Sequence, residues 1–276
     1  MMQSSPILVI GATGKTGSRI VRRLTERDYE VRRGSRSAEI PFDWEDSKTW
    51  EAALDGTAAA YISYFPDLAF PGAVEKIEAL CSVAKRVGVG RLVLLSGRGE
   101  HHARLGEEVV RSSGVKYTLV RAAWFAQNFS EGYLRDPVLS GVIAMPGGDV
   151  REPLVDVDDI ADVAVAALTD DKHTGQLYEV TGPRLMTFRE MAAELAFATG
   201  RNIEYLPISY DQFHAGLVEV ADDFIADVFT GIARETLDGR NAYLADGVQL
   251  ALGRSPRDFL EFARSAAATG TWTRTA

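Results

Sequence analysis

The chain contains very little cysteine: Cys81 is the only one among 276 residues, so no internal disulfide can form. Because Cys81 lies in the helix-like run KIEALCSVAKRVG, we expect it to be a small buried apolar residue. Long hydrophobic runs are also missing, since no apolar stretch approaches the ~18 residues that a membrane-spanning helix needs. The segment 1–6 lacks the basic start of a signal peptide. We therefore expect a cytoplasmic protein without a membrane partner.

A surplus of positive charge is missing too. The formal net charge is −9, which argues against direct contact with nucleic acid through a general electrostatic field. A local pocket can still hold an anionic small molecule. At 276 residues, the chain is long enough for one large domain, or two closely associated ones, with a sizeable core.

Strand and helix signals alternate through the first half of the chain. Short apolar runs such as RLVLLSG do not alternate with polar residues, which is typical of strands covered on both faces. This alternation of elements predicts a Rossmann-type α/β fold with a doubly wound parallel sheet. Later helices are expected to begin at Thr187 and at Asp156 or Asp158. The strands expected in the first half lie at 7–10, 29–33, 58–63, 91–97 and 116–121.

The stretch ILVIGATGKTG allows two interpretations. Its GKT resembles the end of a P-loop, which holds a nucleoside triphosphate and would need its first glycine at position 9. That position is Val9, and Gly11 would make the loop too short to wrap around a phosphate. Neither of the strands at 58–63 and 91–97 ends in an aspartate that would hold magnesium. A triphosphate site is therefore disfavoured.

The three glycines of the same stretch fit a dinucleotide site better. Gly11 permits the turn after the strand, Gly14 lets the backbone approach a pyrophosphate, and Gly17 lets the following helix pack close to the sheet. The helix start supplies unpaired N–H groups and a partial positive charge. A glycine-rich turn without a ligand is the alternative. Three neighbouring side chains can add further donors: Thr13, Lys15 and Thr16.

No acidic residue stands at the end of the second expected strand, where an NAD site usually places Asp or Glu for the ribose 2′-hydroxyl. The sequence there is RRGSRS. A 2′-phosphate needs such donors, and each charge-assisted contact is worth roughly 1.5–3 kcal/mol. We therefore expect NADP(H) as the cofactor, with Ser35 and Arg36 near its 2′-phosphate; a solvated basic turn is the alternative.

Two further segments are expected along the cofactor. FDW follows an expected third strand, and Asp43 beside Trp44 fits an edge-and-face contact with adenine, although a structural turn explains the same residues. Ser63, Tyr64 and Phe65 follow the strand at 58–63 and are expected to line the cofactor channel.

The second half of the chain loses the regular alternation, and Pro and Gly cluster at 146–153. We interpret this cluster as a crossing into a smaller lobe. Residues 1–150 are then expected to form the NADP-binding Rossmann domain, with later segments able to return to it. Residues 151–276 are expected to form a small, mostly helical α/β lobe that binds the substrate.

Several segments together resemble a known family. In order and spacing, they resemble the NmrA-like branch of the atypical short-chain dehydrogenase/reductase superfamily. The segments are GATGKTG, SRS, LVLLSG, SSGVKYTLVRAAWFAQNF, VDVDDIADVAVAAL, GQLYEVTGP and TFREMAAELAFATG. The resemblance implies a Rossmann domain, a small C-terminal lobe and a substrate cleft between them. Some members reduce quinones, isoflavonoids or related ethers with NADPH. Others bind NAD(P) without turnover and act as redox sensors through protein partners.

The catalytic signature of the superfamily, Tyr-x-x-x-Lys, is missing. None of the nine tyrosines is followed by lysine at the fourth position. Reducing members of the branch often carry a lysine on the helix before YTLVR, whereas the matching residues here are Glu107 and Glu108. This departure puts a typical reductase mechanism in doubt.

Two other residues are candidates for catalysis. Ser96 ends a strand at the carboxyl edge of the sheet, where ligands bind in open α/β folds, and it matches the active-site serine of the superfamily. It can hydrogen-bond a substrate carbonyl. His101 and His102 are expected in a loop beside the cleft, where His102 can donate a proton. Two solvated histidines are the alternative, and no ligand spacing indicates a metal site.

The run AAWFAQNF is expected to place Trp124, Phe125 and Asn128 against the nicotinamide and the substrate, with core packing as the alternative for the two aromatic residues. We therefore expect an NADPH-dependent oxidoreductase of a small apolar carbonyl or quinone, since a quinone can take its proton from water. The alternative is a non-catalytic NADP(H) redox sensor, which requires unequal binding of the two cofactor forms. A homodimer or a regulatory protein partner is compatible with these expectations.

Overall fold

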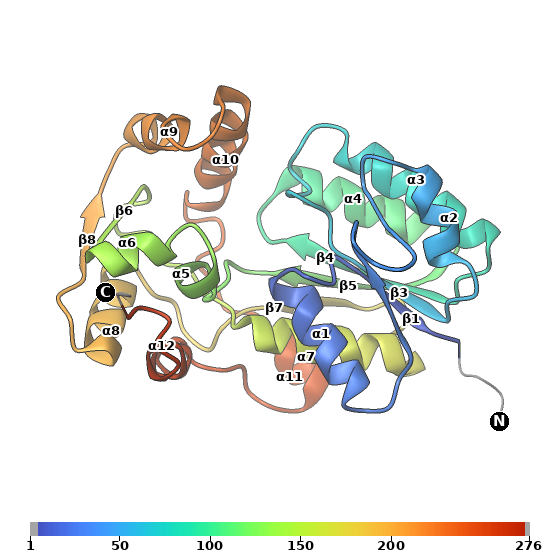
Figure 1. The fold of residues 1–276 in the computed structure, drawn as a ribbon. Helices are drawn as coiled ribbons and strands as arrows, with labels where there is room; N and C mark the ends of the chain where they lie inside the picture. Colours follow the sequence, from blue (N-terminus) through green and yellow to red (C-terminus); the bar gives the residue numbers. More distant parts are fainter. Residues whose placement is uncertain (1–4, 274–276) are drawn as a thin grey trace.

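The computed structural model describes residues 5–273, and its centre is a sheet of six parallel strands (Figure 1). The strand order is β2–β1–β3–β4–β5–β7, so the predicted doubly wound parallel sheet is confirmed. Because the chain adds β2 on one side of β1 and β3 on the other, a crevice opens at the carboxyl ends of β1 and β3. The strands are β1 (Ile7–Ile10), β2 (Val31–Gly34), β3 (Ala59–Ile62), β4 (Arg91–Gly97), β5 (Lys116–Ala122) and β7 (Leu177–Val180).

Helices cover both faces of the sheet. Strand β1 is apolar throughout because both of its faces are covered. Ile7 and Val9 pack into one layer, whereas Leu8 and Ile10 pack into the other. The first layer contains α1 (Lys15–Thr25), α7 (Val157–Thr169) and α11 (Gly247–Leu252). The second contains α2 (Lys48–Leu54), α3 (Ala73–Arg86) and α4 (His101–Ser112).

A smaller lobe stands beside the sheet, at the left of Figure 1, and has a hydrophobic core of its own around Phe129, Phe188 and Met191. Its two strands pair in parallel. The strands are β6 (Val142–Met145) and β8 (Glu204–Pro207). The helices are α5 (Asn128–Glu131), α6 (Arg135–Ser140), α8 (Phe188–Thr199), α9 (Tyr210–Val218), α10 (Asp223–Thr236) and α12 (Phe259–Ala268), and a short 3₁₀ helix (Asp171–His173) precedes β7 in the sheet lobe.

The chain passes between the two lobes more than once. After β5 it builds α5, α6 and β6 in the smaller lobe, and then it returns for α7 and β7, because Val120 of β5 and Tyr178 of β7 pair at the edge of the sheet. It returns once more for α11 before it ends in α12. A single boundary at residue 150 therefore does not separate the lobes.

Local signals located several helix starts correctly. Asp156 caps α7 by accepting the N–H of Asp158 at 2.7 Å, and Thr187 caps α8 in a capping box. The strand expected before FDW is wrong, because residues 35–40 form turns and bends, and Trp44 and Trp50 beyond them pack in an aromatic cluster. None of the helices within residues 5–273 is long and apolar enough to cross a membrane.

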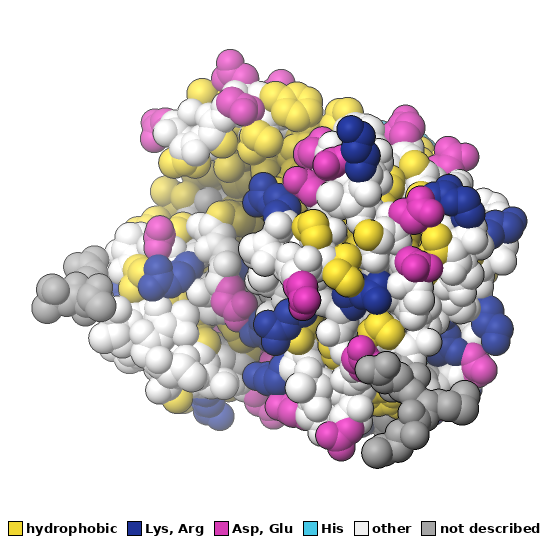
Figure 2. Space-filling model, turned by 45° about the vertical axis from the view of Figure 1, so that its right-hand side comes forward, with side chains coloured by type: hydrophobic (Ala, Val, Ile, Leu, Met, Phe, Trp, Pro, Cys, Tyr) yellow, Lys and Arg dark blue, Asp and Glu magenta, His cyan; other side chains and the backbone are white. Residues whose placement is uncertain are grey.

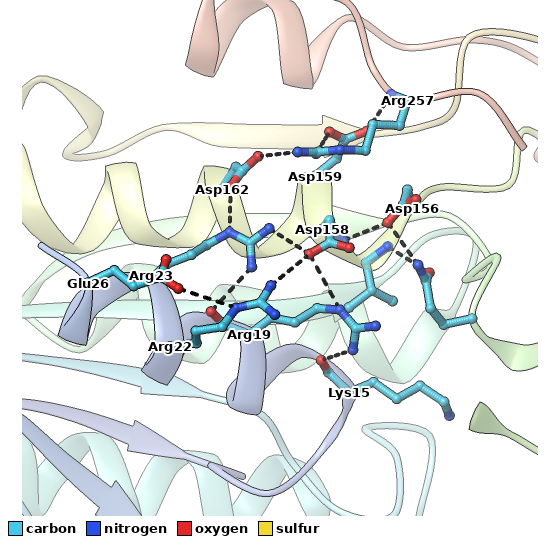
Figure 3. A network of polar contacts seen from close by, with 12 residues as sticks. Lys15, Arg19, Arg22, Arg23, Glu26, Asp156, Asp158, Asp159, Asp162 and Arg257 are labelled. Carbon is cyan, nitrogen blue, oxygen red and sulfur yellow. Dashed lines mark hydrogen bonds and ion pairs between the residues drawn. The ribbon is translucent and has the colours of Figure 1, made fainter. Parts of the chain in front are cut away.

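An ion-pair network joins α1 to α7. Figure 3 shows the arginines of α1 facing the aspartates of α7. Arg23 donates to Asp158 at 2.5 Å and to Asp162 at 2.6 Å. Asp162 also accepts hydrogen bonds from Arg254 (2.6 Å) and Arg257 (3.1 Å), which precede α12. Because Arg23 is largely shielded from solvent, salt screens these pairs less than it screens surface pairs. The network fixes the position of α1 and of the loop that precedes it.

Candidate active site

The loop after β1 forms a turn that suits a phosphate group. Gly11 has a φ of +77°, and a Cβ on it would lie 3.2 Å from the Cβ of Ser63. The N–H groups of Gly11 and Ala12 donate to the carbonyl oxygen of Gly34 at 3.0 and 3.4 Å. A Cβ on Gly17 would overlap the carbonyl oxygen of Gly11. Only glycine lets α1 approach the loop this closely.

Helix α1 begins with N–H groups that are available to an anion. Its N-cap residue, Gly14, forms no side-chain capping bond, and both Thr13 and Gly14 are exposed. Thr16 is buried. The hydrogen-bond donor that was expected from its hydroxyl group is therefore not presented to a ligand. Burial lowers the pKa of the Lys15 ammonium, and the charge of Glu131 opposes part of this shift. The turn and the helix start fit the pyrophosphate of a dinucleotide.

The segment after β2 presents Arg36 to solvent. Within residues 5–273, the Arg36 side chain has no hydrogen bond or ion pair, and Ser35 beside it is half-buried. Arg32 has a structural role, because it donates to carbonyl oxygens at the end of α2, including that of Asp55 at 2.6 Å. Arg33 is exposed on the strand itself. Arg36 is therefore free to meet a phosphate beyond the strand end.

Asp43 and Trp44 form a structural turn and not an exposed platform for adenine. The carbonyl oxygen of Asp43 accepts the indole N–H of Trp50 at 2.6 Å, and the Asp43 carboxylate accepts the N–H of Glu45 at 3.0 Å. Trp44 is only 8% exposed, and its indole N–H donates to the carbonyl oxygen of Ser63 at 3.2 Å. The adenine contact expected for the Trp44 ring is thus not supported, because neighbouring aromatic rings cover it.

A cleft of about 430 Å³ extends from the glycine loop to the smaller lobe. Figure 2 shows hydrophobic side chains gathered in the hollow between the lobes. Phe65, which is expected along the cofactor channel, is 73% exposed and does not line the cleft, whereas several other candidate site residues do. Those in the lining are Lys15, Ser63, Tyr64, Ser96, Trp124, Phe125 and Asn128. The apolar wall from α9, α10 and the segment between them consists of Phe213, Leu217, Ala221, Ile225, Phe229, Ile232 and Ala233.

The hydroxyl group of Ser96 is already used within the protein. It donates to the buried Glu107 carboxylate at 2.6 Å. Glu107 also pairs with Arg121, and its hydrogen bond raises the pKa of the Arg121 guanidinium. The Ser96 proton therefore points to Glu107, in contrast with the expected hydrogen bond to a substrate carbonyl.

His101 and His102 lie in the first turn of α4, so their expected placement in a loop is wrong. The helix extends back to them because Ala103, Glu107 and Val110 fall on one buried face. Both imidazole rings are exposed, contact each other at 5.6 Å between centroids, and do not line the cleft. His102 is thus not positioned to donate a proton there. In the described part of the chain, no three His, Cys, Asp or Glu side chains are grouped as metal ligands.

Two acidic residues that were not recognised from the sequence also line the cleft: Asp67, between β3 and α3, and Glu100, directly before α4. Glu100 is 8% exposed, and its carboxylate lies against Gly97, where a Cβ would overlap it. Burial and the negative charge of Asp67 raise the pKa of Glu100 well above its usual value. No motif links these residues, because they come from separate loops.

Known proteins resemble this chain over most of its length. A family model described as NAD(P)H-binding matches residues 11–171. The NAD(P)H azoreductase of Xenophilus azovorans is 31% identical over 95% of this chain and 98% of that protein. The uncharacterized oxidoreductase YesF of Bacillus subtilis is 32% identical over 99% of this chain and 100% of that protein. Among solved structures, the NADPH-dependent quinone oxidoreductase QOR2 of Escherichia coli, complexed with NADPH, has the same fold, with a TM-score of 0.76 and 20% identity over 94% of this chain and 99% of that one.

Proposed function

We propose that this chain, which belongs to the NAD(P)H-binding family, is an NADPH-dependent reductase of the NmrA-like branch of the atypical short-chain dehydrogenases/reductases. Its substrate is a small, largely apolar carbonyl compound or quinone, or a similarly flat azo compound. The names of the azoreductase and the oxidoreductase among its relatives favour turnover over the alternative of a non-catalytic redox sensor.

The observation that carries this proposal is the continuity of the cleft. Lys15 and Ser63, beside the glycine loop, line the same cavity as Phe229 on α10. A cofactor held at the loop and an apolar molecule held by α9 and α10 would therefore share one cleft. Reduction by a nicotinamide requires this juxtaposition more than it requires any particular side chain.

The residues of the chain have separate tasks in this proposal. The N–H groups at the start of α1 and the Lys15 ammonium bind the pyrophosphate. Arg36 and Ser35 bind the 2′-phosphate and so favour NADP(H) over NAD(H). Trp124, Phe125 and Asn128 position the nicotinamide and the substrate, while the apolar wall excludes water. When bound, the reduced cofactor supplies two electrons and one hydrogen.

The lobe that contains β6, β8, α9 and α10 is accordingly the substrate-binding part. Helix α9 has no buried residues, although Phe213 and Leu217 on it line the cleft. An exposed helix whose apolar side chains line a cleft is suited to bind a ligand that covers its apolar face. The acceptor is therefore expected to be flat and apolar, because it replaces water against that face.

A panel of quinones, enones and azo dyes tests the proposal. We expect at least one of them to accelerate the loss of reduced-nicotinamide absorbance, and more strongly with NADPH than with NADH. Calorimetry on the same sample measures cofactor binding separately. Tight binding of NADPH without turnover of any acceptor would contradict the reductase and favour the sensor.

A further inference from the structure

Glu100 is an acid without a neutralising partner at the cleft. It is 8% exposed, and its Oε2 atom has no hydrogen-bond donor among the described residues. Glu100 stands at the N-cap position of α4, yet its side chain makes no capping bond. The carboxyl group lies instead against Gly97, at the carboxyl end of β4 and next to Ser96. This is the edge of the sheet at which ligands bind in such folds.

Asp67 faces Glu100 from the segment between β3 and α3. Both side chains line the same cleft, and the negative charge of Asp67 raises the pKa of the Glu100 carboxyl group. Asp67 also accepts the N–H of Ala69 at 2.8 Å, which stabilises its anionic form. Glu100 has no comparable donor, so it is the protonated member of the pair.

The charged groups around the pair do not neutralise it. Arg98, close to Glu100 in sequence, donates to Glu179 and to the carbonyl oxygen of Asn241 instead. Glu235 on α10 adds negative charge and is itself paired with Arg240 at 3.2 Å. Burial and like charge therefore act in the same direction, and both favour the protonated form of Glu100.

We propose that the Glu100–Asp67 carboxyl pair is the proton donor that takes the place of the missing Tyr-x-x-x-Lys signature. This inference rests on the proposed reductase function. The C=O or N=N bond of the acceptor gains two electrons and one hydrogen from the reduced nicotinamide. The O–H bond of Glu100 breaks, and its proton forms an O–H or N–H bond at the other end of the acceptor. The pair then takes up a proton from water, because two adjacent buried carboxylates are unstable.

Infrared spectroscopy tests the protonated state without any turnover. Because the buried Glu152 also carries a proton at neutral pH, the spectra are compared in a Glu152→Gln background. That background is expected to show the C=O stretch of a buried carboxylic acid, and adding Glu100→Gln should remove it. Adding Glu108→Gln, on the exposed side of the same helix, should leave it in place. A background spectrum without this band, or one that keeps it after Glu100→Gln, overturns the proposal. Glutamine has the shape of a protonated glutamate, so the variant is expected to fold.

Kinetics test the role of this proton. With an acceptor found in the panel, Glu100→Gln should lower kcat by about 10²- to 10³-fold and leave the Kd for NADPH unchanged, whereas Glu108→Gln should match the wild type. In Asp67→Asn, the loss of kcat at high pH should move to lower pH, because Glu100 no longer faces a negative charge. Equal kcat in Glu100→Gln and wild type refutes the donor and leaves the reductase standing. Failure of every acceptor with the wild type refutes the reductase, and this inference with it.

Discussion

Ser96 donates its hydroxyl group to the carboxylate of Glu107 across 2.6 Å, beneath the floor of the cleft. Arg121 donates to the same carboxylate from its Nε atom at 2.8 Å. At this position of the helix, reducing members of the branch often carry a lysine. Here the acid neutralises Arg121 and fixes the Ser96 side chain, which leaves proton donation to another residue.

Removal of the Glu107 carboxylate should destabilise the protein. Glu107→Ala removes the hydrogen-bonded partner of the largely buried Arg121 guanidinium and leaves it only the longer ion pair with Glu179 at 3.7 Å, so we expect the free energy of unfolding to fall by about 3 kcal/mol. Urea denaturation measures this change. The neighbouring Glu108→Ala, which removes an exposed carboxylate, should stay within about 0.5 kcal/mol of wild type. Equal effects of the two substitutions would disprove the buried pair.

Arg36 should distinguish between the two nicotinamide cofactors. Arg36→Ala removes a charge-assisted contact to the 2′-phosphate, so the Kd for NADPH should rise about 10- to 100-fold while the Kd for NADH stays the same. Calorimetry measures both values. Arg27→Ala, which removes the same charge from another exposed position, serves as the control. A similar loss for NADPH and NADH would rule out a contact to the 2′-phosphate.

The glycine loop should not tolerate a methyl group on the helix side. In Gly17→Ala the new Cβ overlaps the carbonyl oxygen of Gly11, so α1 must move away from the loop. We expect at least a tenfold loss of NADPH affinity and a lower melting temperature. Gly231→Ala in α10 meets no atom within 4 Å and should be neutral or stabilising by up to about 1 kcal/mol. Unchanged cofactor affinity in Gly17→Ala would contradict the role assigned to the loop.

The apolar wall should determine affinity for the acceptor and not for the cofactor. Leu217→Ala removes apolar area from the cleft lining, and KM for an apolar acceptor should rise about three- to tenfold, in line with roughly 1 kcal/mol of lost contact. Steady-state kinetics at saturating NADPH measure it. The adjacent Val218→Ala, which does not line the cleft, is the matched control. If both variants change KM equally, the acceptor does not bind along α9.

Stability should fall with rising pH because of Glu152. This residue is 1% exposed, its carboxylate oxygens have no partner among the described residues, and burial raises its pKa to about 8, although the charge of Arg98 opposes the shift. As the pH rises, the unfolded chain, with a glutamate pKa of 4.5, therefore releases this proton at a lower pH than the folded protein does. Between these two values, wild type should lose up to roughly 1.4 kcal/mol per pH unit relative to Glu152→Gln. Urea titrations across this range measure the difference, and parallel curves for the two proteins would disprove it.

Local signals predicted the parts of the fold that depend on neighbouring residues. The glycine spacing from Gly11 to Gly17 predicted the strand, turn and helix, because each glycine has its own steric reason. Apolar strands such as Arg91–Gly97 predicted a sheet covered on both faces. The cap of α8 was predicted from Thr187, and the structure adds Glu190 as its partner in a capping box.

Features that depend on distant segments could not be predicted in this way. Pairing of β6 with β8 brings Val142 opposite Glu204, and no local pattern indicates that partner. Asp67 and Glu100 meet only because the loops after β3 and β4 open at the same edge of the sheet. The burial of Trp44 depends on its packing against Trp50 of α2, and sequence periodicity does not reveal that contact.

The repeated crossing between lobes has a consequence for synthesis on the ribosome. A nascent chain that ends near residue 150 lacks α7 and β7, so β5 is left as an uncovered edge and the apolar face shared with Val155 and Ile160 is open. The sheet lobe is completed only when α11 arrives, with Gly247 seated against the backbone of Glu179. The emerging polypeptide must therefore avoid aggregation until almost all of it has been translated, unlike a protein whose first domain can fold while the second is still being made.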